Sequence, residues 1–421
     1  MKNLILISIS VLILIGEIFS QGTKRVLFLG NSYTAVNNLP QLTANVALSA
    51  GDTLIFDSNA PGGYTLQGHS TNATSLNKIN LGNWDFVVLQ EQSQLPSFPD
   101  GQVQSSVFPY ARTLDSIINS VNNCTETMFF MTWGRKNGDA SNCSVWPPVC
   151  TYQGMDSLLY LRYMMMTDSN HAVVSAVGRV WNYLRNTQPL IDLYQTDGSH
   201  PSVAGSYAAA CCFYSSIFRK DPTLITFNST LSSSDASIIR SAVKTVIYDS
   251  LLNWRIGSYD PVAAFTYQST LSNFSFSNTS TNATQYYWSF GDGDTSTFSN
   301  PSHTYIIPGT YTVTLQAGKC GITDTISAIV NVLTTNIHSE VAENIISAFP
   351  NPVSGIMKVK SKNSDFQSIY ATDLSGKNIL LKFFKSQDET LFIDVSELTE
   401  GVYFLQLFSR ESVSKIKIIK Q

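Results

Sequence analysis

The sequence predicts an α/β domain with a parallel sheet, followed by two small β-sandwich domains. Over residues 21–257, short runs that are apolar throughout alternate with segments of helical apolar spacing. Strands of a parallel sheet covered on both faces have this pattern, because neither face is solvated. From about residue 258 the chain becomes rich in Ser, Thr, Asn and aromatic residues in alternating patterns, which is typical of β-sandwiches.

The order of the expected elements indicates where a ligand site would form. Strands are expected at 25–30, 53–56, 84–89, 127–133 and 172–177, and helices at 39–49, 107–121, 155–166 and 203–218. Ligands bind beyond the carboxyl ends of the strands in such sheets. The residues Ser32, Gly62, Gly63, Gln90, Gln92 and Trp133 lie at the end of an expected strand or shortly after it. We therefore expect them to share one rim.

The first twenty residues predict export. Lys2 precedes an apolar run over 4–15, and small residues lead to Ser20, which is the pattern of a secretory signal peptide at 1–20. No later segment has the length and apolar character of a membrane span, so the protein is expected to be secreted or on the cell surface. A net charge of −4 gives no basic footprint for nucleic acid.

The cysteines fit an oxidising compartment. Cys143 and Cys150 are expected to pair across a short loop, whereas Cys211 and Cys212 lie on an expected helix and are interpreted as buried thiols. No spacing typical of a metal site is present, so neither a metal nor a cofactor is expected.

An Asp/His pair stands just before the expected helix at 203–218. Asp197 and His200 are three residues apart, which lets a carboxylate orient an imidazole that acts as a general base. Ser32, in the run Gly30-Asn31-Ser32, supplies a candidate nucleophile. The alternative is that Asp197 and Ser199 only cap the helix.

Residues 24–257 resemble the SGNH (GDSL-type) hydrolase superfamily. Gly30-Asn31-Ser32 stands where that family's first block carries its nucleophile, and Asp197-x-x-His200 matches its last block. The resemblance implies a flavodoxin-like three-layer fold and ester hydrolysis by a triad of Ser32, His200 and Asp197.

The oxyanion hole is less complete in this resemblance. The family uses the N–H that follows the nucleophilic strand, a glycine of the second block and an asparagine of the third. Gly62 or Gly63 fits the second role, since a glycine lets the backbone approach a substrate. The usual Gly-x-Asn-Asp is replaced by a segment with Gln90 and Gln92, and the sequence does not choose between these two amides.

Two further resemblances account for the rest of the chain. Trp288-Ser-Phe-Gly-Asp-Gly-Asp294 and the segments after it resemble the PKD type of immunoglobulin-like domain, expected at 258–334. A polar linker is expected at 335–344. Residues 345–421, with Ala348-Phe-Pro-Asn-Pro-Val353, resemble a type IX secretion system C-terminal sorting domain, which implies export by that machinery. Asp292 and Asp294 are interpreted as a hairpin turn rather than a calcium site.

These observations predict a secreted serine esterase of the SGNH type. Its expected substrate is an acyl ester, with acetylated carbohydrate favoured by the chain's export and by the PKD-type domain. The alternative is a non-catalytic glycan-binding or adhesion protein on a hydrolase-like scaffold, which the altered third block favours. A phosphate- or sulfate-processing enzyme is disfavoured because metal-ligand spacing is missing.

Overall fold

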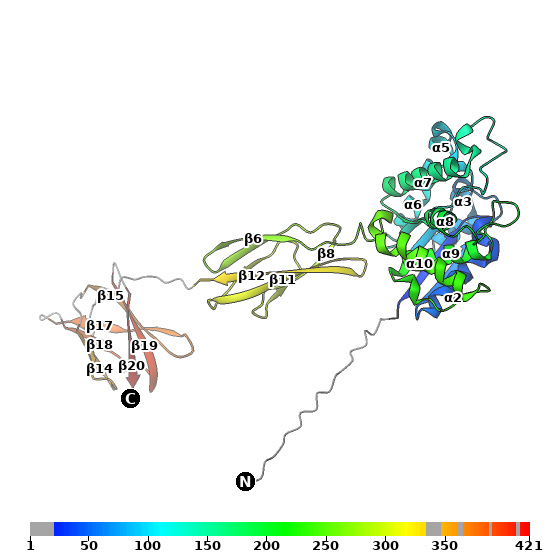
Figure 1. Cartoon of the computed structure of the whole chain (residues 1–421). Helices are drawn as coiled ribbons and strands as arrows, with labels where there is room; N and C mark the ends of the chain where they lie inside the picture. Colours follow the sequence, from blue (N-terminus) through cyan, green and yellow to red (C-terminus); the bar gives the residue numbers. More distant parts are fainter. Residues whose placement is uncertain (1–20, 334–346, 361–364, 387–389, 410–412) are drawn as a thin grey trace, which may run out of the picture. The chain divides into compact units, whose positions relative to one another are not determined.

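Figure 1 shows the computed structural model of the chain. The structure describes residues 21–333, 347–360, 365–386, 390–409 and 413–421. The expected signal peptide and the expected linker at 335–344 lie outside the described residues.

A five-stranded parallel sheet forms the centre of the first domain. Its strands are β1 (Thr23–Leu29), β2 (Thr53–Asn59), β3 (Phe86–Leu89), β4 (Glu126–Phe130) and β5 (Val173–Ser175). They lie in the order β2-β1-β3-β4-β5, and each neighbouring pair is parallel. This is the flavodoxin-like order, whose topological switch point lies between β1 and β3. The predicted α/β fold is confirmed, and the switch point is where a ligand site is expected.

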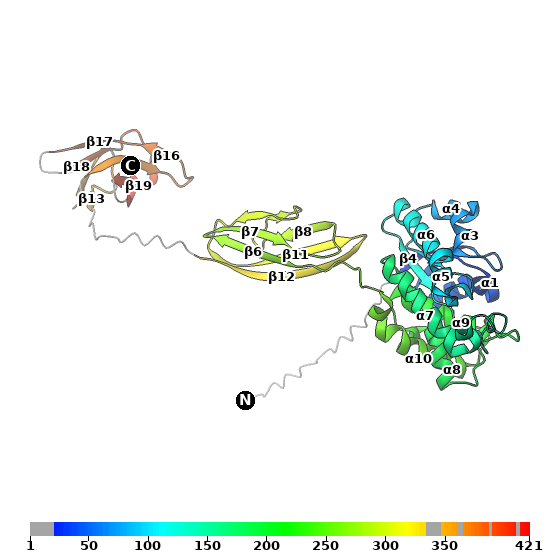
Figure 2. The ribbon, with the colours of Figure 1, turned by 90° about the horizontal axis from the view of Figure 1, so that it is seen from above.

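Helices enclose this sheet. They are α1 (Ser32–Ala35), α2 (Leu39–Ser49), α3 (Leu66–Thr71), α4 (Ala73–Ile79), α5 (Asp100–Ser106), α6 (Phe108–Val121), α7 (Tyr152–Ser169), α8 (Val177–Thr187), α9 (Val203–Phe218) and α10 (Ser233–Val246). One group consists of α3, α4 and α6, and a second of α8, α9 and α10 (Figure 2). Every residue of β3 is buried, as expected for a strand that is covered on both faces.

Helix α9 is buried on nearly all sides, and its small residues make this possible. A side chain at Gly205 would collide with the carbonyl of Leu193 and the ring of Trp181. The segment that carries Asp197 and His200 leads into α9. Its C-terminal end is therefore anchored by a helix that is tightly packed in the core.

The next part of the chain forms two antiparallel layers. Its strands are β6 (Phe265–Thr270), β7 (Asn273–Asn278), β8 (Gln285–Ser289), β9 (Thr295–Ser296), β10 (Ser302–Thr304), β11 (Gly309–Lys319) and β12 (Ile322–Val332). One sheet has the order β10-β7-β6 and the other β12-β11-β8-β9. Asp292 accepts the N–H of Asp294 at 3.1 Å, so this pair lies in the turn between β8 and β9. Together with His303 it also places potential metal-ligand atoms within 4.8 Å of one another, so the choice between a turn and a cation site stays a prediction.

The last part has its own core, with Met357, Ile369 and Leu405 fully buried. Its strands are β13 (Ser347–Phe349), β14 (Ile356–Lys360), β15 (Phe366–Thr372), β16 (Asn378–Leu380), β17 (Lys382–Lys385), β18 (Leu391–Asp394), β19 (Gly401–Ser409) and β20 (Val413–Lys420). They form two four-stranded sheets, β13-β14-β18-β17 and β16-β15-β19-β20. The prediction of two small β-domains is confirmed. Within the described part of the chain, no helix is long and apolar enough to cross a membrane.

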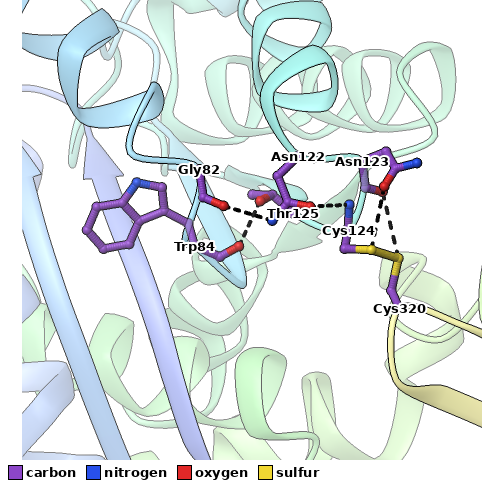
Figure 3. Close-up of a disulfide and its surroundings, with 7 residues drawn as sticks. All are labelled: Gly82, Trp84, Asn122, Asn123, Cys124, Thr125 and Cys320. Atoms are coloured by element: carbon purple, nitrogen blue, oxygen red, sulfur yellow. Dashed lines mark hydrogen bonds between the residues drawn. A yellow bond between two sulfur atoms is a disulfide. The ribbon is translucent and has the colours of Figure 1, made fainter.

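Four of the cysteines form disulfide bonds. The predicted pair Cys143–Cys150 is confirmed. A second bond, which sequence reasoning missed, joins Cys124 to Cys320, 196 residues further along the chain (Figure 3). Cys124 lies in the turn between α6 and β4, where Asn122 donates to the carbonyl of Gly82 at 2.9 Å. Cys211 and Cys212 are buried free thiols, as expected.

Candidate active site

Ser32 opens the short helix α1, directly after β1. The neighbouring Asn31 side chain donates to the carbonyls of Tyr64 at 3.0 Å and of Glu91 at 3.3 Å. Its main-chain N–H donates to Oε1 of Gln90 at 3.1 Å. These bonds join the loops that follow β1, β2 and β3, so Ser32 is held on a fixed turn at the switch point.

Gly30 is required for this close packing of loops. A side chain here would collide with the side chains of Thr34 and Gln90. On the other side, Nε2 of His69 faces the carbonyl of Gly30 at 2.8 Å, and Nδ1 faces the hydroxyl of Ser75 at 2.8 Å. Burial lowers the pKa of His69, so its ring is neutral and serves to hold the two loops in place. His69 therefore does not reach the rim.

The Asp197–His200 segment forms a compact turn before α9. One carboxylate oxygen of Asp197 accepts the N–H groups of Ser199 at 2.9 Å and of His200 at 3.0 Å. Gly198 sits at φ 65°, where a side chain would be strained. Its carbonyl accepts the N–H of Lys136 at 2.8 Å, which ties the turn to the loop after β4.

The structure brings Ser32, His200 and Asp197 together in a line. The Ser32 hydroxyl lies 2.9 Å from Nε2 of His200, and Nδ1 of His200 lies 2.5 Å from Oδ2 of Asp197. Partial burial alone would raise the pKa of Asp197, but hydrogen bonds from the His200 ring and from two N–H groups hold that pKa below its usual range. The carboxylate is therefore ionised and can orient the imidazole so that Nε2 accepts a proton from the hydroxyl.

A stack of aromatic rings supports the histidine turn. Tyr33 and Trp133 stack at 4.7 Å, and Trp133 and Trp181 stack at 3.6 Å between ring centroids. The Tyr33 hydroxyl lies 2.7 Å from the hydroxyl of Ser199, and Trp133 donates to the carbonyl of the same residue at 3.1 Å. Tyr33 also meets the His200 ring edge-on at 5.4 Å. Because Tyr33 and Trp133 are buried, they position the turn rather than stack on a substrate.

Removing the Tyr33 hydroxyl tests this support. We expect Tyr33→Phe to lower kcat for ester hydrolysis about 2- to 10-fold, because one hydrogen bond to the turn is worth about 0.5–1.5 kcal/mol. Tyr194→Phe is the matched control, since it removes a buried hydroxyl that donates to Gly134 at 2.7 Å. Equal losses in both variants would show that the Tyr33 effect is general destabilisation.

The two candidate glutamines have different surroundings. Gln90 is fully buried; its amide donates to Oδ1 of Asn31 at 2.6 Å and to the carbonyl of Glu91 at 3.0 Å, so it holds the nucleophile loop. Gln92 is half-buried. Its side-chain oxygen Oε1 accepts the main-chain N–H of Gln94 at 2.8 Å, and its side-chain nitrogen Nε2 donates to Oε1 of Gln94 at 3.2 Å. Gln90 is therefore enclosed in the fold, whereas the Gln92 residue keeps part of its surface exposed.

Gly62 and Gly63 lie in the exposed turn after β2. A side chain at either position would meet no atom within 4 Å, and Gly63 has φ 71°. The turn closes with the N–H of Tyr64 donating to the carbonyl of Pro61 at 3.2 Å. The carbonyl of Tyr64 accepts from Asn31, as described above, so the turn is tied to the nucleophile loop and presents its backbone to solvent.

Comparison with known proteins identifies the two β-domains. Residues 260–332 match the family model of the PKD domain, and residues 347–421 match that of the secretion system C-terminal sorting domain. The sorting domain implies an interaction with secretion machinery and delivery to the cell surface or beyond. No curated protein matches the chain.

Solved structures resemble single parts of the chain. A DUF4886 family protein from Bacteroides uniformis is 18% identical, covers 55% of this chain and 95% of its own, and has a TM-score of 0.46. A candidate SGNH hydrolase from Slackia heliotrinireducens is 25% identical, with 46% and 97% covered and a TM-score of 0.38. The PKD1 domain of the Vibrio cholerae metalloprotease PrtV is 35% identical, with 18% and 99% covered and a TM-score of 0.17. The fold of the first domain rests on its strand order and register.

Proposed function

We propose that the protein is an exported serine hydrolase that cleaves carboxylic esters. The observation that carries the proposal is the line of hydrogen bonds from the Ser32 hydroxyl through His200 to Asp197, at 2.9 and 2.5 Å. Ser32 is 168 positions from His200 in the sequence, yet the two side chains meet at the switch point of the sheet with Asp197 on the far side of the ring, which is the order that nucleophilic catalysis requires.

In the proposed reaction, the Ser32 oxygen attacks the ester carbonyl while Nε2 of His200 takes its proton. His200 then returns the proton to the departing alcohol, which leaves an acyl-enzyme. Water, deprotonated by the same nitrogen, attacks this intermediate and releases the acid and Ser32. Asp197 stabilises the imidazolium in both steps.

The negative oxygen that forms in each step needs donors. We assign this role to the main-chain N–H of Ser32 and to an N–H of the Gly62–Gly63 turn, with the Gln92 amide as the side-chain donor in preference to Gln90. The exposure of the turn and the internal bonds of Gln90 support this assignment. Removing one such donor typically costs about 2.7–4 kcal/mol of barrier.

The proposed substrate is an acetyl ester on carbohydrate. The sorting domain takes the protein to where extracellular polymers are found, and the PKD domain accompanies the hydrolase domain there. Release of acetate from an acetylated polysaccharide tests the proposed substrate. Hydrolysis of p-nitrophenyl acetate, measured in parallel, tests the proposed reaction. Hydrolysis of only the small ester would leave the reaction in place and exclude this substrate. Glycan binding without hydrolysis of any acyl ester would favour the adhesion alternative.

The pH profile should report one proton on the acid side. Because the pKa of Asp197 is held below its usual range, the carboxylate stays ionised while His200 takes up a proton and stops acting as a base. We expect kcat/KM for p-nitrophenyl acetate to fall tenfold per pH unit on the acid limb. A flat profile, or a slope of two, would contradict this division of roles.

A further inference from the structure

The carboxyl group of Glu91 joins two loops of the candidate site, the loop after β2 and the loop after β3. Glu91 is fully buried in the loop after β3. Its Oε1 accepts the N–H of Gln92 at 2.5 Å, and both carboxyl oxygens face the N–H of Leu66, at 3.2 and 3.3 Å. Leu66 begins α3, immediately after the turn that carries Gly62 and Gly63. The side chain therefore clamps the glycine turn to the rim.

The main chain of Glu91 fastens the same place to the nucleophile. Its carbonyl accepts the side-chain amides of Asn31 at 3.3 Å and of Gln90 at 3.0 Å. One residue thus bonds to the loops after β1 and β2 and lies in the loop after β3. These three loops supply every group of the proposed oxyanion site.

Among the residues that the structure describes, no cationic side chain pairs with this carboxyl group. Burial raises the pKa of Glu91 to about 8, against the opposing effect of its bonds from Gln92 and Leu66. Tyr163 on α7 interacts electrostatically with Glu91, and Tyr33 on α1 and His69 on α3 lie in the helices that follow the loops joined by Glu91. The charged groups Arg135 and Asp197 act on Tyr33. Burial raises the pKa of both tyrosines and lowers that of His69, so all three are neutral near pH 7. Glu91 is the group in this region that gains a charge as the medium becomes alkaline.

We propose that Glu91 is a positioning residue that, in its protonated form, holds the Gly62–Gly63 turn beside Ser32 and keeps the region behind the oxyanion uncharged. A neutral acid keeps its contacts with the two N–H groups and does not oppose the negative charge of the transition state. An ionised Glu91 would place a second negative charge in a water-excluded region, where like charges repel strongly. The inference rests on the proposed function and adds an alkaline limit to it.

Two variants separate the clamp from the charge. Glu91→Gln keeps an oxygen that accepts N–H bonds but cannot ionise; we expect its kcat at pH 7 to be within threefold of the parent, and the fall in kcat above about pH 8 to disappear. Glu91→Ala removes the clamp; we expect kcat to fall about 10- to 100-fold, because small misplacements of reacting groups have effects of this size. KM should change less than threefold in both variants.

Glu126→Gln is the matched control. Glu126 is a carboxyl group whose pKa is also raised by burial, but it lies at the amino end of β4, whereas Ser32 follows the carboxyl end of the parallel strand β1. Its replacement should leave kcat and the alkaline limb unchanged. If Glu91→Gln keeps the alkaline fall, or if Glu126→Gln abolishes it equally, the proposal is wrong.

Hydrogen exchange tests the clamp without any activity. Glu91→Ala should raise amide exchange in peptides that contain residues 61–66, and Glu91→Gln should not. Unchanged exchange in Glu91→Ala would overturn the clamp even if the enzyme is active. If the parent chain hydrolyses no ester while exchange behaves as expected, the proposed function fails and the clamp stands.

The pH dependence of thermal stability tests the protonation state of Glu91 independently of enzyme activity. The pKa of Glu91 is higher in the folded chain, about 8, than its ordinary value of 4.5. Between these values the folded state holds a proton that the unfolded state has lost, so this group's contribution to stability falls as the pH rises from about 4.5 to 8. The melting temperature of Glu91→Gln relative to the parent should therefore increase from pH 5 to pH 9. A constant difference would contradict the buried, protonated state.

Discussion

Ser32→Ala is expected to lower kcat for p-nitrophenyl acetate by about 10⁴-fold or more, with little change in KM. The hydroxyl is the group that forms the acyl-enzyme, so its removal leaves only the oxyanion donors and binding to accelerate the reaction. The expected loss is large because the three groups of a triad act as a unit. Steady-state kinetics on the purified chain, with a melting curve to verify folding, measures it.

Ser199→Ala is the matched control for this variant. Ser199 carries a hydroxyl one residue before His200, and that hydroxyl bonds to Tyr33 at 2.7 Å. Its loss removes one support and should reduce kcat no more than about tenfold. If Ser32→Ala retained most of the parental rate while Ser199→Ala lost it, the nucleophile would have been misassigned.

The second large effect is expected on stability, from the disulfide between Cys124 and Cys320. This bond closes a loop with a sequence separation of 196 residues. In the chain-entropy model it stabilises the folded chain by about 5 kcal/mol, compared with about 2 kcal/mol for a loop as short as that of Cys143–Cys150. We expect the double variant Cys124→Ser/Cys320→Ser to unfold at a lower denaturant concentration than Cys143→Ser/Cys150→Ser.

Peptide mapping without reduction measures the same bond directly. The expected product is a cross-linked pair of peptides that contain Cys124 and Cys320, which reduction separates. The covalent link would also keep the hydrolase domain and the PKD domain in one band on a non-reducing gel after cleavage of the chain near residue 258. Free thiols at both positions would contradict the pairing.

The sheet could be predicted from the sequence because its strands are covered on both faces. The apolar run that ends at Gly30 and the one that ends at Leu89 are recognisable without any knowledge of tertiary structure. Their order along the chain then placed Ser32 and the glycine turn after neighbouring strands. The distance between Ser32 and His200 could not be predicted, because it depends on how α9 packs.

Six helices were not predicted, α1, α3, α4, α5, α8 and α10, and the last two carry recognisable signals. In α8, Val177, Val180, Trp181 and Leu184 have the spacing of a buried helix face, but the apolar run that ends at Val177 predicts a strand. In α10, Ser232 caps the first turn, and Ala236, Ile239 and Val243 follow at helical spacing. These are errors of interpretation, since the pattern is visible in the residues.

The Cys124–Cys320 bond and the different surroundings of Gln90 and Gln92 could not be predicted, for a physical reason in each case. Nothing local relates Cys124 to Cys320, because they lie in turns of different domains. Gln90 and Gln92 are two residues apart, a spacing that points both side chains the same way on an extended segment. The chain bends after β3, so Gln90 is buried against Asn31 while Gln92 is half-buried and bonds to Gln94.

The most direct measurement is labelling of the chain with a fluorophosphonate, which forms a bond to an activated serine oxygen and releases fluoride. Mass spectrometry should find one adduct, on the peptide that contains Ser32, and the rate of labelling should collapse in His200→Ala. A chain that stays unlabelled, or that is labelled at another serine, would contradict the proposal that Ser32 is activated by His200.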